Sequence, residues 1–269
     1  MPIRSSSQIV ENLPQEIIDA IIKEHRGDAS TLAACSLVSK EWLVVARCHL
    51  FATIDVSATN FRAVQTLLLS FASAVKTIRF HVAENDAWIS QFCSDVTPGS
   101  TVSALALYLY GVELGRDTRA ALTETFSDLT ECTIHTLIAS RRTLVKDIQT
   151  CCTFEGLISL NLSGSYYGSY PVESTSKLPS NIRALKLDLP SNAMKRIMAW
   201  LLAHEVMPTL TTFHASNVDE TSLPGVLLFT QLSASTLEDL HLGVQCHPRS
   251  VYSTFEFRCP VFVNLNLTF

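Results

Sequence analysis

The sequence predicts an α/β solenoid of parallel strands with outer helices, preceded by a short three-helix unit. One six-residue pattern carries this prediction, with apolar residues in its first, fourth and sixth places, as in Leu157-Ile158-Ser159-Leu160-Asn161-Leu162. Eight copies have as middle apolar residues Ile78, Leu105, Cys132, Leu160, Leu185, Phe213, Leu240 and Leu265, so successive copies are 25 to 28 residues apart. A near-constant spacing of this size is typical of stacked structural repeats.

Composition supports a folded chain and argues against several classes of protein. Of the 269 residues, 47% are hydrophobic and 17% charged, so burial can offset the entropy lost on ordering. The net charge of -5 gives no basic surplus with which to bind a nucleic-acid backbone. The first residues are polar, and no apolar run reaches the roughly 18 residues that suggest a membrane span. These features predict an intracellular protein, cytoplasmic or nuclear, whose eight cysteines are mostly free thiols.

The first fifty residues show helical periodicity. After Leu13-Pro14, the isoleucines at 17, 18, 21 and 22 recur at three- and four-residue steps, which predicts an amphipathic helix. Gly27-Asp28 ends it, and Asp28 or Ser30 can cap a second helix that carries Leu32, Cys35 and Leu37. A third helix contains Trp42, Val45 and Ala46. Three short helices bury little by themselves, so this unit is expected to lean on a neighbour or a partner.

The same stretch resembles a known family. Leu13-Pro14-Gln15-Glu16-Ile17, the later Leu32, Val38-Ser39-Lys40-Glu41-Trp42 and His49-Leu50-Phe51 together look like an F-box of the fungal type. The resemblance covers residues 11–55, and residues 56–269 resemble the irregular leucine-rich repeats often joined to F-boxes. It implies a substrate receptor that binds the Skp-family adaptor of a cullin-RING ubiquitin ligase through the F-box and an unknown protein substrate through the repeats.

Carried onto this chain, the resemblance implies seven adaptor-contacting residues: Leu13, Pro14, Ile17, Ile21, Leu32, Val38 and Trp42. Each of them could instead pack the helices onto the first repeat, and Trp42 is the most ambiguous. The alternative function is therefore a repeat-based interaction scaffold, without a ligase role, in which the helices are a packing cap.

From Phe51 onward, strands alternate with helical segments. Phe51, Ile54 and Val56 form a candidate additional first rung. Helical spacing predicts segments at Asn60 to Ala74, Asp86 to Val96, Asp117 to Asp128, Leu137 to Lys146, Asn192 to Val206 and Val226 to Ser235. Asn60 is a candidate N-cap. Such crossovers are the usual connection between parallel strands.

Side-chain alternation predicts which strand residues face outward. If the apolar positions face the core, the residues between the last two of them form a column on the concave face. This column contains Arg79, Ala106, Thr133, Asn161, Lys186, His214, His241 and Asn266. Lys186, His214 and His241 would lie on neighbouring strands and could form a cationic patch at mildly acidic pH that binds the substrate. The alternative is a solvated sheet face with no ligand.

Two departures from the repeat family are visible. The places where leucine-rich repeats carry a buried asparagine ladder hold Tyr110, Leu137 and Ser165, which favours an irregular solenoid. Phe262, Leu265 and Leu267 form a strand pattern followed only by Thr268 and Phe269. We therefore expect an open edge that a partner covers, or a natural chain that continues beyond this one.

Sequence motifs favour a protein that is not an enzyme. The chain has no phosphate-binding loop, no Gly-x-Ser-x-Gly elbow and no Gly-x-Gly-x-x-Gly turn. The set nearest to a metal site, His241, Cys246, His247 and Cys259, does not match the spacing of paired zinc ligands. We expect no cofactor, metal or catalytic residue, and we keep a Cys-His hydrolase as the remaining catalytic alternative.

Overall fold

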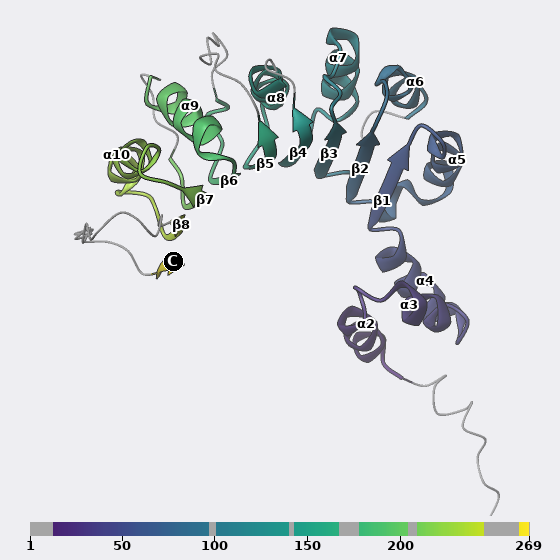
Figure 1. The fold of residues 1–269 in the computed structure, drawn as a ribbon. Helices are drawn as coiled ribbons and strands as arrows, with labels where there is room; N and C mark the ends of the chain where they lie inside the picture. The colour runs from purple at the N-terminus through teal and green to yellow at the C-terminus, as the bar shows by residue number, and fades with distance from the viewer. Residues whose placement is uncertain are drawn as a thin grey trace, which may run out of the picture.

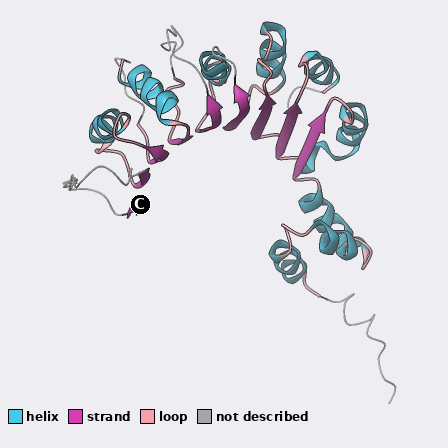
Figure 2. Cartoon of the chain, viewed as in Figure 1, coloured by secondary structure: helices cyan, strands magenta, loops and turns pink. Residues whose placement is uncertain are grey.

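The chain forms an arc of parallel strands with helices on its outer side and a separate group of helices at one end (Figure 1). The computed structural model describes residues 13–96, 101–139, 143–166, 178–203, 209–244 and 264–268. Figure 2 shows strands and helices alternating along the arc, which agrees with the predicted α/β architecture of a helical start followed by a parallel sheet.

The helical unit consists of α2 (Gln15–Glu24), α3 (Ala29–Cys35) and α4 (Lys40–Leu50). Asp28 is the N-cap of α3, where its carboxylate accepts hydrogen bonds from the amides of Ser30 and Thr31. Ser39 caps α4 by accepting from the amide of Trp42. The predicted three helices are therefore present, although α3 ends at Cys35 and leaves Leu37 in the following turn.

This unit has a hydrophobic core of its own. Ile18, Ile22, Leu32, Cys35, Trp42 and Ala46 are buried together, with Leu13, Val45 and Leu50 packed against them. The core under the sheet is a second cluster that begins at Ile54. Since β1 (Thr53–Ser57) already pairs in the sheet, the change from one core to the other falls between Leu50 and Ile54.

The sheet has nine strands in sequential order, and each pair of neighbours is parallel. After β1 the strands are β2 (Thr77–Val82), β3 (Ala104–Tyr110), β4 (Glu131–Ala139), β5 (Ser159–Tyr166), β6 (Ala184–Asp188), β7 (Thr212–Val218), β8 (Asp239–Val244) and β9 (Asn264–Thr268). The last, β9, pairs with β8 and lies at the end of the strand order.

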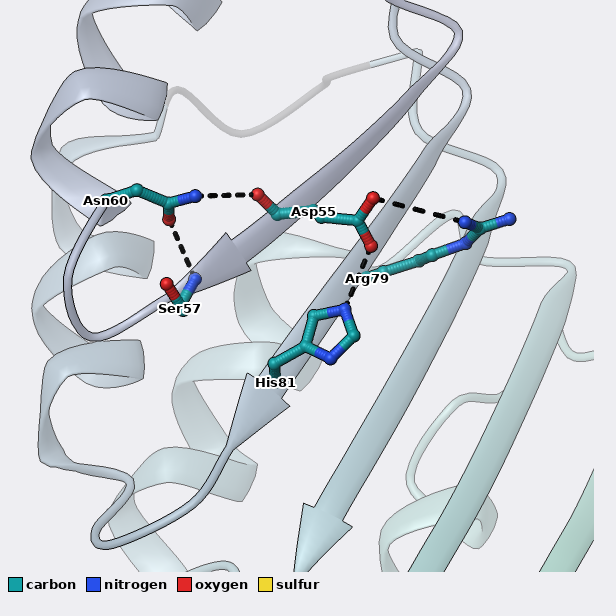
Figure 3. A network of polar contacts seen from close by, with 5 residues as sticks. All are labelled: Asp55, Ser57, Asn60, Arg79 and His81. Atoms are coloured by element: carbon teal, nitrogen blue, oxygen red, sulfur yellow. Dashed lines mark hydrogen bonds and ion pairs between the residues drawn. The ribbon is translucent and has the colours of Figure 1, made fainter. Parts of the chain in front are cut away.

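Helices connect most successive strands and form the outer layer. They are α5 (Phe61–Phe71) with the short η1 (Ala72–Ala74), α6 (Ala87–Asp95), α7 (Arg116–Thr125), α8 (Thr143–Cys152), α9 (Ser191–Leu202) and α10 (Leu223–Ser233). Asn60 precedes α5 as predicted, but its side chain makes no cap bond and instead closes the turn after β1. It accepts from the Ser57 amide at 2.8 Å and donates to the Asp55 carbonyl at 3.1 Å (Figure 3).

The pairing register confirms the repeat spacing read from the sequence. Neighbouring strands align Ile54, Ile78, Leu105, Cys132, Leu160, Leu185, Phe213, Leu240 and Leu265 in one row. This alignment includes the candidate first rung at Ile54. The members up to Leu240 are all buried. A burial position that recurs in each repeat thus produces one continuous core from β1 to β8.

A ladder of backbone carbonyls joins the repeats at the amino ends of the strands. In each step, two consecutive amides donate to a single carbonyl of the preceding repeat, as Lys76 and Thr77 do to Ala52. The accepting carbonyls are those of Ala52, Lys76, Ser103, Thr130, Ile158, Arg183 and Thr211, with N···O distances of 2.8 to 3.1 Å. Main-chain groups, rather than an asparagine ladder, therefore connect the repeats from β1 to β8.

One predicted helix was misplaced. The segment Leu137 to Lys146 was expected to be helical, but β4 continues to Ala139 and α8 begins at Thr143. Leu137 extends the sheet, because it pairs with Tyr110 and its carbonyl accepts from the Gly111 amide at 2.9 Å. The register between β4 and β5 then shifts between Thr136 and Ala139. An apolar residue in a strand extension was thus mistaken for the start of a helix.

Aromatic side chains join the helical unit to the first repeat. Phe51, directly after α4, stacks on Phe71 at the end of α5, with ring centroids 4.7 Å apart. The guanidinium carbon of Arg47 lies 5.5 Å from the Phe71 ring centroid, within range of a cation–π interaction. These three side chains therefore form a contact between the helical unit and the first repeat.

Within the described ranges, no helix is long and apolar enough to cross a membrane. The six described cysteines are free thiols, while Cys246 and Cys259 lie outside the described residues. Burial raises the pKa of Cys93 to about 11 and that of Cys152 to about 12, as expected for thiols packed among apolar groups.

Candidate interaction surfaces

The helical unit exposes several large apolar side chains in spite of having its own core. Ile17 (47% exposed) and Ile21 lie one turn apart on α2, Leu37 (86%) and Val38 lie in the turn before α4, and Val44 (64%) lies on α4. We call these five residues the exposed apolar set. Single exposed apolar residues are common, so the number of them in this short unit makes its surface a candidate contact site.

The seven residues implied by the family resemblance divide into two groups. Pro14, Ile17, Ile21 and Val38 are exposed and accessible to a partner. Leu32 (1% exposed) and Trp42 (8%) lie in the core of the helical unit, and Leu13 is half-buried against it. The core residues can therefore support the contact surface without forming it.

Sequence reasoning missed Leu37 and Val44 as candidate contacts. Leu37 was assigned to the apolar face of the second helix, but α3 ends two residues earlier and the side chain turns to solvent. Val44 is followed by Val45 and Ala46, of which Ala46 is buried. Helical spacing from Trp42 to Ala46, four residues apart, could have shown that Val44 lies off the buried face.

The sheet carries its polar residues in parallel rows. The register places Asp55, Arg79, Ala106, Thr133, Asn161, Lys186, His214, His241 and Asn266 side by side, which we call the central row. This confirms the predicted column and adds Asp55 to it. Lys186, His214 and His241 occupy adjacent strands as expected, and the two histidine ring centroids are 5.5 Å apart.

Two carboxylates interrupt the expected cationic patch. Asp239 lies with His214, whose Nε2 is 2.9 Å from Asp239 Oδ2. Asp188, two residues after Lys186, accepts a 2.7 Å hydrogen bond from the side-chain amide of Asn217. The three predicted residues do come together, but the surface around them carries both signs of charge.

A second row, two residues further along each strand, contains aromatic rings. His81, Tyr108 and His135 are neighbours in the register. The His81 and Tyr108 rings stack with centroids 4.8 Å apart and planes 7° apart, and His135 lies 5.7 Å from Tyr108. We call these three residues the aromatic row. The sequence analysis missed it, although each member directly follows the last apolar position of its repeat.

Polar contacts hold both ends of the aromatic row. Figure 3 shows Asp55 between Arg79 and His81, with 2.9 Å from Asp55 Oδ1 to His81 Nε2 and 4.0 Å from Asp55 Oδ2 to the Arg79 guanidinium. At the other end, His135 Nδ1 is 2.7 Å from the Ser163 hydroxyl oxygen. The row is therefore a preorganised surface of ring edges on the sheet.

The Ser163–His135 pair has the spacing of a nucleophile and its general base. Such a pair also needs a group that orients the base, and the ring beside His135 is that of Tyr108 rather than a carboxylate. Among the residues that the structure describes, no three metal-ligating side chains gather. Of the four residues that came nearest to a metal site in the sequence, Cys246, His247 and Cys259 lie outside the described residues.

Comparison with known proteins gives no family assignment. No protein-family model matches the chain, and no curated protein matches it significantly.

Proposed function

We propose that this chain is the substrate-recognition subunit of a Skp-cullin-F-box ubiquitin ligase. The helical unit is an F-box that binds the Skp-family adaptor and, through it, a cullin-RING ligase in the cytoplasm or nucleus. The sheet belongs to an irregular leucine-rich-repeat solenoid, and it holds the protein to be ubiquitinated.

One observation carries the proposal. The stretch with the F-box-like sequence pattern is a three-helix unit with its own core, and it still exposes Ile17, Ile21, Leu37, Val38 and Val44. A unit that needed only to cap the sheet would turn such side chains toward the repeats. Their exposure supports a partner that buries them, and apolar anchors of this kind dominate the energy of protein interfaces.

In this role the chain has no chemistry of its own to perform. A receptor accelerates ubiquitin transfer by holding the substrate close to the ligase and in a fixed orientation, which removes translational and rotational entropy from the reaction. A stable arc with one binding unit at its end and a broad polar face suits that task. The proposal therefore includes no catalytic residue, metal or cofactor.

A specific observation also favours the alternative of a repeat scaffold with a helical cap. Phe51 and Arg47 pack on Phe71, so the end of α4 does contact the first repeat. Solenoids need such terminal caps. The two functions differ in whether the helical unit binds an adaptor, which makes adaptor binding the deciding measurement.

The test is a double substitution of exposed residues, Ile17→Glu with Val38→Glu, in the full chain. Loss of buried interface anchors costs about 2 kcal/mol or more, so binding to a Skp-family adaptor should weaken by at least about thirtyfold in co-purification or titration. Leu69→Glu is the matched control, because Leu69 is 80% exposed on α5, outside the helical unit.

Circular dichroism should show both variants folded, since the altered side chains are exposed in the free chain. Adaptor binding by the double variant at the level of the Leu69 control would contradict the assignment and favour the capping role.

A further inference from the structure

The charge on the described sheet face is biased toward carboxylates. The outward-facing strand positions from β1 to β8 hold four acidic residues, Asp55, Glu131, Asp188 and Asp239, against two basic ones, Arg79 and Lys186. With neutral imidazoles, the face therefore carries an excess of two negative charges. The whole chain has the same sign, with a net charge of -5.

Neutral or titratable donors orient three of these carboxylates. His81 holds Asp55, Asn217 holds Asp188 and His214 holds Asp239, at distances of 2.7 to 2.9 Å. In the two aspartates at β6 and β8, the hydrogen bond engages one oxygen and leaves the second available as an acceptor. Carboxylates that are already held in place lose less side-chain entropy when a ligand binds.

Glu131 and Asp239 lie in a third row, which is two residues before the central row and continues beyond them to Ala104 and Asn264. The register from β4 to β8 aligns Glu131, Ser159, Ala184, Thr212 and Asp239. The three residues between the carboxylates are short and uncharged, so a chain can lie over them without meeting a bulky side chain. Four strand steps separate the carboxylates, or about 19 Å along the sheet.

We propose that this face binds an extended basic segment of a protein partner, with lysine or arginine side chains on Glu131 and Asp239. An extended chain advances about 3.3 Å per residue, so the two basic residues would be about six positions apart. This inference rests on the proposed function in taking the sheet as the substrate surface, and it adds the class of substrate: proteins with a basic, extended segment.

The probe is a fluorescein-labelled peptide with blocked ends that alternates lysine and serine over roughly twelve residues, long enough to span the row. Glutamine–serine and glutamate–serine peptides of equal length are the comparison ligands. Fluorescence anisotropy with the full chain, without adaptor, should show binding of the lysine peptide that weakens as salt rises from about 0.05 M to about 0.5 M.

Substitutions locate the site on the row. Glu131→Gln and Asp239→Asn should each weaken the lysine peptide by about two- to fivefold, the range for a single exposed ion pair. Asp117→Asn and Glu124→Gln are the matched control pair, because each removes one negative charge from α7, in the outer layer. Lys186→Gln, which removes a like charge from the face, should instead tighten binding by a similar factor.

Two results would overturn the inference: equal binding of the glutamine or glutamate peptide, or equal weakening by the α7 control pair. Neither depends on the adaptor. If the lysine peptide binds as described but the adaptor does not, the proposed ligase role fails and the basic-segment site stands. If the adaptor binds but the peptide does not, the opposite holds.

Discussion

Replacing Gly164 by alanine should strongly destabilise the solenoid. Gly164 lies in β5 with φ +127°, a conformation that residues with a Cβ rarely adopt. An added Cβ would clash with the Thr136 carbonyl oxygen and lie 2.7 Å from its carbonyl carbon and 2.8 Å from its nitrogen. All three atoms belong to the backbone of a paired strand, so a side-chain rotation cannot relieve the contact.

The expected loss in the free energy of unfolding of Gly164→Ala is the sum of two contributions. Placing an L residue in a sparsely populated backbone region costs about 1–3 kcal/mol, and inserting a carbon into a packed site costs about 1–3 kcal/mol more. The expected loss of about 2–6 kcal/mol is a large part of the roughly 5–15 kcal/mol that stabilises a folded domain. Urea unfolding followed by circular dichroism measures this loss.

Gly27→Ala is the matched control, because nothing lies within 4 Å of its added Cβ and its φ is not in the left-handed region. Its free energy of unfolding should change by less than about 1 kcal/mol, in the stabilising direction. If Gly164→Ala also changed stability by less than about 1 kcal/mol, the close strand approach at Thr136 would be refuted.

Three further predictions concern other parts of the molecule. Trp42→Ala should lower the stability of the helical unit by about 3–5 kcal/mol. Trp42→Phe should lower it by less than about 1.5 kcal/mol, because it keeps the packing and removes a buried indole N–H that has no partner among the described residues. Amide hydrogen exchange in α2 and α4 measures both losses, and equal values would contradict the core position of Trp42. Hydrogen bonds from the side chains of Thr31 and Ser30 hold the pKa of Asp28 well below its usual range, so the ionised carboxylate stabilises α3 above the unfolded-state pKa near 3.9, and this stabilisation is lost as the pH falls below that value. The difference in melting temperature between wild type and Asp28→Ala should therefore narrow from pH 7 to about pH 2. A constant difference would count against the cap. Iodoacetamide at about pH 8 should modify the exposed Cys48 much faster than the buried Cys93 or the half-buried Cys152, because desolvation raises the pKa of both of these thiols. Peptide mapping that found the reverse order would contradict this packing.

The repeat architecture was predictable because burial recurs at a nearly fixed interval. Each middle apolar residue from Ile78 to Leu240 has the same environment, so the period alone identifies the rungs and their alignment. The outward column followed from strand alternation for the same reason. The extension of β4 past Leu137 was not predictable, because a single apolar residue fits a strand end as well as a helix start.

Contacts between rows could not be inferred from the period. His214 pairs with Asp239, 25 residues away and in a different row, and this contact depends on side-chain rotation as well as register. The stack of His81 on Tyr108 likewise requires both strands to be in register and both rings to stand parallel. On the helical unit, the solvent exposure of Leu37 depended on a helix end at Cys35, and helix ends are the least certain feature of sequence-based assignment.

A small rotation at the aromatic contact around Phe71 would become a larger displacement at the far end of the sheet. From β1 to β9 the sheet makes eight strand steps, about 38 Å along its curve, so a 10° rotation of α4 against α5 would displace a group at the far end by at most about 7 Å. That displacement equals about two residues of extended chain. How precisely the far strands can hold a bound group relative to the helical unit therefore depends on the packing at this junction, where Arg47, Phe51 and Phe71 are in contact.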